Sequence, residues 1–177
     1  MALRNIIEQG DEFLEKKSRA VTKFDERLHI LLDDMAETLA ANDGLGLAAV
    51  QVGILRRVFI AIKDEKVLDF VNPEILEVSG EQQNIEGCLS IPGVYGFTKR
   101  SANVKMRAQD RNGEYFEVEG SDLFARELLH ENDHLDGILF SSKVIRYLTE
   151  EEIAAMNAKS DDEDEDEDED TGVDSGE

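Results

Sequence analysis

The chain has 177 residues, of which 41% are hydrophobic, so it is long enough to bury the core of one domain. Its net charge of −22 is uneven, because residues 161–177 hold 12 acidic and no basic side chains, which leaves 29 acidic and 19 basic ones, a net −10, in residues 1–160. This charge excludes a broad phosphate-contacting surface, and with it direct DNA binding. The chain has no apolar run that could span a bilayer, no secretory signal pattern at its start and a single cysteine, so we expect a soluble cytoplasmic protein without disulfides.

The first predicted element is a helix over residues 22–42. Thr22 and Asp25 resemble a weak capping box at its start. His29 lies away from the centre of the apolar stripe, so we expect it at the surface rather than on a metal. The stripe itself has helical spacing and comprises Leu28, Leu31, Leu32, Met35 and Leu39.

Residues 44–53 form a small apolar segment punctuated by glycines, without the spacing or the lysine of a phosphate-binding loop. Taken alone, this segment indicates a tightly packed turn in which Gln51 is the one polar side chain. Short strands are expected after it, over residues 58–62, 67–71, 75–78, 84–91, 104–108 and 115–118, with breaks at Asn72–Pro73 and Pro92–Gly93 and a hairpin turn at 110–113. Because several strands come before one long helix, the pattern favours an α+β fold of short antiparallel or mixed sheets.

A second amphipathic helix is predicted within residues 121–140, with Gly137 just past its last turn. It contains His130 and His134, whose spacing of four places both imidazoles on one helix face, where they can reach one metal ion. Glu131 lies one step round the helix, where a carboxylate can contact a metal-bound water without being a ligand. We therefore expect the sheets to pack around a central metal-binding helix, with the first helix as an N-terminal addition.

Two histidines do not complete such a site, because a catalytic metal commonly takes three protein ligands and leaves one position for water. A glutamate further along the chain is the thermolysin-like solution, and residues 150–152 supply candidates. The other candidate is Cys88 as a thiolate, although a lone cysteine is more often a small buried hydrophobe. The residues by themselves leave both possibilities open.

Residues 149–152 form a capping box, which predicts a short helix to about residue 159. Residues 161–170 are ten acids in succession, and because like charges repel and nothing can be buried, they are expected to be disordered. The chain is thus expected to hold one catalytic domain, residues 1–160, and a disordered acidic tail, residues 161–177, that favours solubility.

Three separated stretches resemble, in order and spacing, the signature motifs of the peptide deformylase family. Residues 44–51, G-L-G-L-A-A-V-Q, resemble the motif G-x-G-L-A-A-x-Q; residues 86–90 resemble E-G-C-L-S; and residues 130–134, H-E-N-D-H, resemble H-E-x-D-H. The likeness runs from about residue 3 to residue 147. It implies the peptide deformylase fold and a cytoplasmic hydrolase that removes the formyl group from N-formylmethionine of newly synthesised polypeptides and releases formate.

By this resemblance, Cys88, His130 and His134 would bind one divalent metal. The family characteristically uses Fe(II), and Ni, Co or Zn can substitute, a choice that this ligand set does not decide. Glu131 would be the general base and would then pass the proton to the leaving amine.

The resemblance also assigns groups that contact the substrate. The Gln51 amide and the Leu89 backbone N–H would hold the developing oxyanion, and the backbone of Gly46 would align the peptide. The apolar pocket for methionine is expected to include Leu45, Leu123 and Leu128.

Two supporting contacts near the metal are candidates, for which the alternatives are two solvated surface charges in the first case and a solvated helix residue in the second. Glu86 stands at the family position that pairs with an arginine, for which Arg100 is the candidate, and Asp133 is a candidate for orienting a ligand histidine. The chain departs from the commonest family pattern at Leu129, where many members have Gln, and at Glu127, where a small or apolar residue is usual. These departures put the shape of the pocket in doubt and leave the metal ligands intact.

The expected partners are N-formylmethionyl nascent peptides. A transient association with the ribosome is also possible by the resemblance, but the acidic tail would repel RNA phosphates.

One rival function is an HExxH metallopeptidase that cleaves internal peptide bonds with a glutamate as third ligand. Replacing Cys88 would distinguish the two functions, because it should destroy metal binding in a deformylase and do little in the metallopeptidase. The other rival is a structural protein whose metal only stabilises the fold. Such a metal site would need a fourth protein ligand, which the sequence does not offer. A member that has lost activity is disfavoured, since Gln51 and Glu131 are intact.

Overall fold

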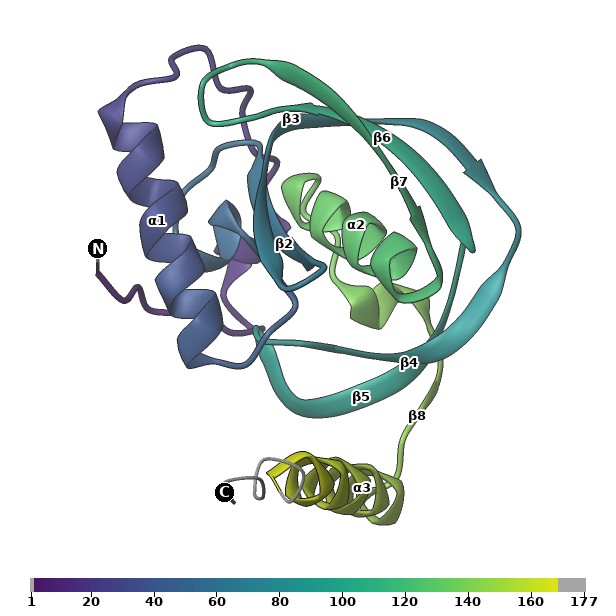
Figure 1. The fold of residues 1–177 in the computed structure, drawn as a ribbon. Helices are drawn as coiled ribbons and strands as arrows, with labels where there is room; N and C mark the ends of the chain where they lie inside the picture. The colour runs from purple at the N-terminus through teal and green to yellow at the C-terminus, as the bar shows by residue number, and fades with distance from the viewer. Residues whose placement is uncertain (1, 169–177) are drawn as a thin grey trace, which may run out of the picture.

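The computed structural model of the chain describes residues 2–168, with side chains described as far as residue 162. Two antiparallel sheets enclose the central helix α2, and α1 packs on the outside of the larger sheet (Figure 1). The larger sheet has the strand order β1-β2-β3-β6-β7, and the smaller has the order β4-β5-β8. The α+β fold around a central metal-binding helix is thereby confirmed.

The described residues form three α-helices, three short 3-10 helices and eight strands. The α-helices are α1 (Glu26–Ala41), α2 (Asp122–Leu135) and α3 (Glu150–Asp168), and the 3-10 helices are η1 (Glu12–Glu15), η2 (Ala49–Val52) and η3 (Phe140–Lys143). The strands are β1 (Gly46–Ala48), β2 (Val58–Lys63), β3 (Lys66–Ser79), β4 (Gln82–Cys88), β5 (Ile91–Arg100), β6 (Asn103–Gln109), β7 (Tyr115–Ser121) and β8 (Val144–Tyr147). None of the described helices is long and apolar enough to cross a membrane.

Helix α1 begins at Glu26, four residues later than predicted. Its N-cap is Asp25, whose carboxylate accepts a hydrogen bond from the Leu28 amide at 3.2 Å, so the expected capping box of Thr22 with Asp25 is wrong. The predicted stripe is correct: all five of its apolar residues are buried in one cluster with residues of β1 and β2. This packing holds the C-terminal end of α1 beside the segment that leads into β1.

Strand β3 continues through Asn72–Pro73, where a break was predicted. Asn72 adopts a left-handed conformation with φ of 50°, and the pairing with β6 shifts register at this point, as in a β-bulge. The Asn72 side chain replaces the lost ladder contacts by bonding the Val21 backbone and the Gln109 side chain. A proline is tolerated at such an irregularity because the missing N–H is not needed there.

Strand β5 begins at Ile91, so the prediction that Pro92–Gly93 ends an extended stretch is also wrong. Cys88 pairs with Ile91 across the two-residue turn Leu89–Ser90, and β8 pairs with β5 only at residues 96–98. Pro92 therefore lies where one side of β5 has no neighbouring strand, and its missing N–H is tolerated. This tight turn positions Cys88 beside the central helix α2.

Helix α2 is held in the core by its apolar face. Ala125, Leu128 and Leu135 are fully buried against Phe59 and Phe70 of the larger sheet and their neighbours. Burying a Leu or Phe side chain contributes about 1.5–3 kcal/mol, so this face fixes the helix that carries both histidines. Gly137, with φ of 73°, follows the helix as predicted, and a Cβ there would collide with the backbone of Glu15.

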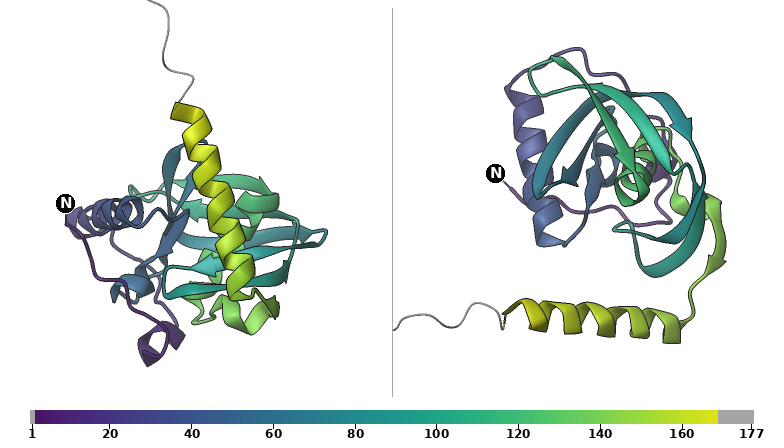
Figure 2. Two further views of the ribbon diagram at one scale, coloured as in Figure 1. Left: turned by 90° about the horizontal axis from the view of Figure 1, so that it is seen from below. Right: turned by 45° about the vertical axis from the view of Figure 1, so that its right-hand side comes forward.

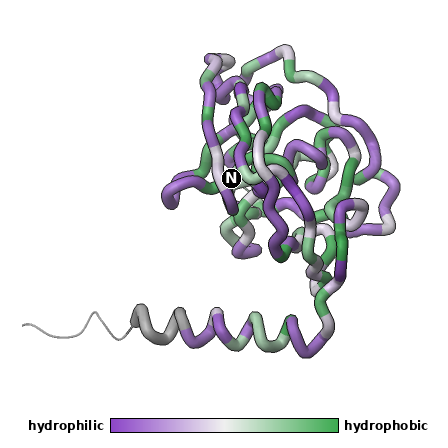
Figure 3. Tube along the Cα trace, turned by 90° about the vertical axis from the view of Figure 1, so that its right-hand side faces the viewer, coloured by the Kyte–Doolittle hydropathy of each residue, from purple (hydrophilic) through white to green (hydrophobic). Residues whose placement is uncertain are grey.

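Helix α3 is longer than the sequence suggested. The predicted capping box is confirmed, because Thr149 N–H donates to Glu152 Oε2 at 2.8 Å and Glu152 N–H donates to Thr149 Oγ1 at 3.2 Å. The helix continues to Asp168; residues 169–177 lie outside the described part, and the disorder of the acidic tail stays a prediction. A capped helix gains one hydrogen bond for each added residue. The right-hand view of Figure 2 and Figure 3 show α3 running below the body.

Candidate metal centre and active site

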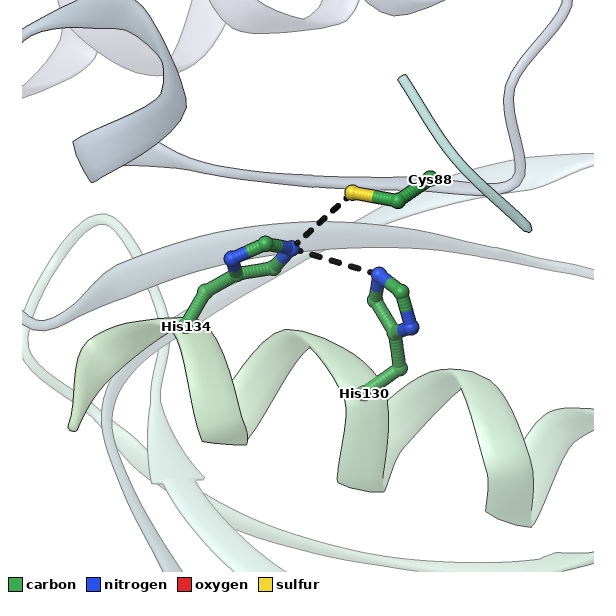
Figure 4. Close-up of side chains that lie close together, drawn as sticks. All are labelled: Cys88, His130 and His134. Atoms are coloured by element: carbon green, nitrogen blue, oxygen red, sulfur yellow. Dashed lines mark hydrogen bonds between the residues drawn. The ribbon is translucent and has the colours of Figure 1, made fainter. Parts of the chain in front are cut away.

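Three ligand atoms converge between the end of β4 and the middle of α2. Cys88 Sγ lies 3.4 Å from His134 Nε2, which lies 3.2 Å from His130 Nε2 (Figure 4). The ligand atoms of these three residues all lie within 4.8 Å of one another. The two histidines share one helix face as predicted, and the third residue of the cluster is Cys88.

The donor set fits a divalent transition metal. A thiolate and two imidazole nitrogens are ligands that Zn and Fe accept, and three of them leave one position open. The thermolysin-like alternative fails, because the cluster that the described residues form with both histidines contains Cys88 and no glutamate; Glu152 is engaged with Arg146 and Thr149 at the start of α3. His29 lies elsewhere, with its Nε2 at 2.8 Å from the Arg111 carbonyl, in agreement with the prediction that it is not a ligand.

His130 is oriented by Glu86, which was missed as its direct partner. His130 Nδ1 donates to Glu86 Oε1 at 2.5 Å, which leaves Nε2 facing the ligand cluster. Glu86 in turn accepts bonds from Thr98 Oγ1 at 2.6 Å and from Arg100 Nη2 at 2.6 Å. The predicted Glu86–Arg100 pair is therefore confirmed, and it supports a ligand in the way outer carboxylates do in metal sites.

Asp133 does not orient a histidine. Its carboxylate accepts a bond from Arg100 Nη1 at 2.9 Å and pairs with Lys143 Nζ at 3.1 Å. It thus acts on His130 only through Arg100 and Glu86. A four-residue spacing along a helix predicts a shared face, but it does not show which residue of a distant strand lies opposite.

Burial and hydrogen bonds set the protonation of this cluster. Burial opposes the ionisation of Glu86, but hydrogen bonds from His130 and Arg100 outweigh it and hold the pKa of this carboxyl well below its usual range. Burial, reinforced by the charge of His130, lowers the pKa of His134 well below its usual value and so favours a neutral imidazole. Burial also disfavours charge on His130, but hydrogen bonds with Cys88 and Glu86 outweigh burial and raise the pKa of His130. A metal cation must therefore compete with a proton for His130 Nε2.

Glu131 is an unpaired carboxyl beside the ligands. It is 2% exposed, its Oε1 lies 4.0 Å from His130 Nε2, and its buried Oε2 has no hydrogen-bond partner among the described residues. Burial is the main cause that raises its pKa to about 8. A Cβ placed on Gly46 would lie 2.8 Å from Glu131 Oε1, so the glycine lets strand β1 approach this carboxyl closely.

The Gln51 amide also points at the cluster. Its Oε1 accepts a bond from the Ala48 amide at 2.9 Å, which fixes the side chain. Its Nε2 then lies 3.1 Å from Ser90 Oγ and 3.6 Å from Cys88 Sγ. Taken alone, this segment indicated only a tight turn, and the family resemblance assigned Gln51 to the site; the structure places its amide beside the metal ligands.

A cavity of about 640 Å³ opens beside the cluster. Leu45 and Leu123 line it, as does Glu127, but Leu128 is fully buried in the core and does not reach it. The prediction that Leu128 belongs to the pocket is wrong because that position faces the sheet. Leu129 is partly buried against the same core, so its departure from the family pattern does not change the cavity lining.

Three further residues contact the site; Ser90 ends the motif at residues 86–90, whereas Thr98 and Met156 had no signal in the sequence. Thr98 holds Glu86, Ser90 contacts Gln51, and Met156 lines the cavity from α3. Thr98 belongs to an ordinary strand pattern and Met156 follows the predicted first turn of a surface helix. Only the paired register of β4 with β5 and the direction of α3 bring them to the site.

A cluster of three protein ligands that leaves room for water, with an unpaired carboxylate next to it, is typical of catalytic rather than structural metal centres. The fold and the site thus define a metal-dependent hydrolase. The comparisons with known proteins narrow this class.

The model of the polypeptide deformylase family matches residues 3–149. A peptide deformylase of Acetivibrio thermocellus is 55% identical over 153 residues, covering 86% of this chain and 90% of the relative. Peptide deformylase 1 of Bacillus subtilis is 50% identical over 158 residues, covering 88% and 99%. The crystal structure of a Thermotoga maritima peptide deformylase superposes with a TM-score of 0.80 at 39% identity and covers 81% of this chain and 99% of its own. The chain belongs to the polypeptide deformylase family, and its activity is the removal of the formyl group from nascent polypeptides.

Proposed function

We propose that the substrate is the N-formylmethionine of newly made polypeptides, and that Glu131 moves the proton in its hydrolysis to formate and a free amine. The observation that carries this proposal is the buried carboxyl of Glu131, which has no partner for Oε2 and lies 4.0 Å from His130 Nε2. A general base needs such an unengaged position, and burial raises the pKa of this carboxyl above its usual value.

Cys88, His130 and His134 would hold the metal, which supplies Lewis-acid polarisation and lowers the pKa of a water molecule. Glu131 accepts the proton of the attacking water at its carboxylate and delivers it to the nitrogen of the leaving amine. Burial of Glu131 stabilises the protonated form between these two transfers.

Two donors would stabilise the oxyanion that develops on the formyl oxygen. Gln51 presents Nε2 toward Cys88, and its other amide atom is already held by Ala48, so the donor is oriented in advance. The backbone N–H of Leu89 belongs to the turn directly after Cys88. Preorganised donors of this kind typically contribute about 3 kcal/mol each to lowering a barrier.

Strand β1 would align the peptide. It is the edge strand of the larger sheet and pairs only with β2 among the described strands, so the backbone of Gly46 is available to an extended chain. Leu45 and Leu123, both partly exposed, supply apolar surface for the methionine side chain where they line the cavity. Glu127 lies in the same lining and makes this pocket more polar than an all-apolar one.

Fe(II) is the proposed metal in the cell, with Ni, Co or Zn able to replace it, since thiolate and imidazole ligands suit all four. Residues 1–160 are the proposed catalytic domain, which is consistent with the extent of the family match. The proposed location is the cytoplasm. Transient contact with the ribosome would use a surface other than α3, because the acids of that helix repel RNA phosphates.

The test is formate release from formyl-Met-Ala-Ser by anaerobically purified Fe(II)- or Ni-loaded protein, beside Glu131→Ala with its metal content measured. We expect rapid release by the wild type and a loss of at least 10²-fold in the variant. Release that survives in the variant would overturn the role of Glu131. Cleavage of internal bonds in unblocked peptides, with no formate from the blocked one, would instead support a metallopeptidase.

A further inference from the structure

The two proposed oxyanion donors belong to turns of two different sheets. Gln51 lies in η2, directly after β1 of the larger sheet, and Leu89 lies in the turn between β4 and β5 of the smaller sheet. The Gln51 side chain contacts Ser90 Oγ of that second turn at 3.1 Å. Because this contact joins two side-chain atoms at the ends of rotatable bonds, it does not fix the distance between the two backbones.

Residues 6–9, the bridging segment, join the two turns through backbone hydrogen bonds. The Ile7 N–H donates to the Gln51 carbonyl at 2.7 Å, and the Gln9 N–H donates to the Ser90 carbonyl at 2.7 Å. Gln51 and Ser90 are 1% and 0% exposed, so their carbonyls depend on protein donors. The two donor nitrogens are two residues apart and therefore lie at most about 7 Å from each other. The bridging segment thus limits the separation of the two turns.

The bridging segment is fastened to helix α1 just before it reaches the site. The Arg4 N–H donates to Thr38 Oγ1 at 3.0 Å, and the Arg4 side chain pairs with the buried Asp34 at 2.8 Å. Ile6 packs against the apolar cluster that contains α1, and it also lines the substrate cavity. Both turns are therefore held against a fixed part of the fold.

We propose that residues 6–9 are positioning residues for the oxyanion site, where they set the distance between the Gln51 amide and the Leu89 N–H. The N–H groups of Ile7 and Gln9 are already bonded to carbonyls, so they act on the reaction only through the donors that they position. Such donors stabilise the developing charge only from the correct place, and a displacement of about 1 Å can lower a rate about 10²-fold. This inference rests on the proposed function and adds a positioning element outside the three sequence motifs.

The test removes each bonded N–H of the bridging segment in the full-length, metal-loaded protein, with the variants Ile7→Pro and Gln9→Pro. Proline has no N–H, so each variant loses one bond to a turn. We expect kcat for formyl-Met-Ala-Ser to fall at least about tenfold in each variant, because a misplaced oxyanion donor acts mainly in the transition state. KM and the metal content should stay close to the wild-type values.

The matched control is Glu12→Pro, a proline at the first position of η1 in the same part of the chain. A helix leaves this N–H without an intrahelical partner, and the preceding Asp11 is extended, with φ of −83° and ψ of 119°, as a residue before proline should be. The control should keep the wild-type kcat. Urea unfolding shows whether each variant is folded.

A second measurement separates positioning from a general effect on the fold. Ile7→Pro is also made in the Gln51→Glu background, where the side-chain donor is already absent. If the bridging segment acts through that donor, the added proline should lower kcat by less than about threefold there, because two changes to one catalytic unit are not additive. Arg4→Ala, which frees the segment from α1 and leaves both bonds to the turns, should lower kcat by a smaller factor than either proline.

Wild-type kcat in both proline variants would overturn the inference and leave the deformylase function intact. An equal fall in kcat with and without the Gln51 donor would also overturn it, because the segment would then act on the fold as a whole. Where a proline variant does not fold, wild-type kcat in Arg4→Ala would decide against the inference. No formate from the wild-type protein would instead overturn the proposed function itself.

Discussion

Glu86 fixes the orientation of His130, because its Oε1 accepts the hydrogen bond from His130 Nδ1 at 2.5 Å while the same carboxylate is held by Arg100 at 2.6 Å. All three side chains are almost completely buried. The pair therefore links the smaller sheet to the central helix and also decides which imidazole nitrogen faces the metal ligands.

Replacing Glu86 with Gln should lower metal affinity by about 10- to 100-fold, because the neutral amide no longer fixes the tautomer of His130. It should also lower the free energy of unfolding by about 3 kcal/mol, since Arg100 keeps Asp133 but loses its closest buried partner. Metal competition and urea unfolding measure the two effects. The matched control is Glu81→Gln, whose pair with Lys99 is exposed and should contribute less than about 1 kcal/mol. Unchanged metal affinity in Glu86→Gln would contradict the orienting role.

Changing Gly46 to Ala tests the close approach of β1 to Glu131. The new Cβ would lie 2.8 Å from Glu131 Oε1 and 2.9 Å from its Cγ, so the carboxyl must move. A displacement of about 1 Å at a catalytic group can lower the rate about 10²-fold, and we expect kcat to fall by that order with the metal retained. As a control, Gly10→Ala meets no atom within 4 Å and adds only backbone strain, about 1–2 kcal/mol, at φ of 107°. Full activity of Gly46→Ala would show that Glu131 is not confined by β1.

Changing Gln51 to Glu isolates the oxyanion donor. A carboxylate oxygen can still accept the Ala48 amide, so the turn should remain folded, but the Nε2 donor is lost. We expect kcat to fall by about 10²–10³ with a small change in KM, because a donor to the developing oxyanion acts mainly in the transition state. Steady-state kinetics beside the exposed replacement Gln83→Glu would check this. A loss confined to KM would assign Gln51 to substrate binding instead.

Much of the fold followed from local patterns. The stripe from Leu28 to Leu39 predicted α1, the four-residue spacing of His130 and His134 predicted their common helix face, and Thr149 with Glu152 predicted the start of α3. These signals are local, because each depends on residues within one or two turns of a helix.

Other features depended on partners that are distant in the sequence. The break expected at Asn72 is absent because the Asn72 side chain bonds Val21 and Gln109, and Leu128 misses the pocket because the larger sheet covers it. Cys88 could be assigned as a ligand only through the family motif, since no spacing rule links a strand to a helix 42 residues later. Met156 lines the cavity because of the direction in which α3 runs, and the sequence of α3 alone does not determine that direction.

Asp34 should make stability depend on pH. Its buried carboxylate accepts the Ala2 amide at 2.7 Å and pairs with Arg4 Nη2 at 2.8 Å, which docks the N-terminal segment on α1. The Ala2 hydrogen bond is the main cause that lowers the pKa of Asp34, with Arg4 adding to it against burial. Because the folded pKa is depressed, the contribution is complete well above the unfolded value of 3.8 and is lost as the pH falls through and below it.

We therefore expect Asp34→Asn to lower the free energy of unfolding by about 1–2 kcal/mol at pH 7, since hydrogen bonds to a charged group are lost. The difference from the wild type should shrink as the pH falls from 5 toward 3, because the unfolded chain takes up a proton on Asp34 over this range while the folded carboxyl, with its lowered pKa, still resists protonation. Urea unfolding at pH 7, 5 and 3 measures this, with the exposed replacement Asp64→Asn as a control that should stay close to the wild type throughout. A difference that is constant with pH would mean that Asp34 acts through shape and neutral hydrogen bonding rather than through its charge.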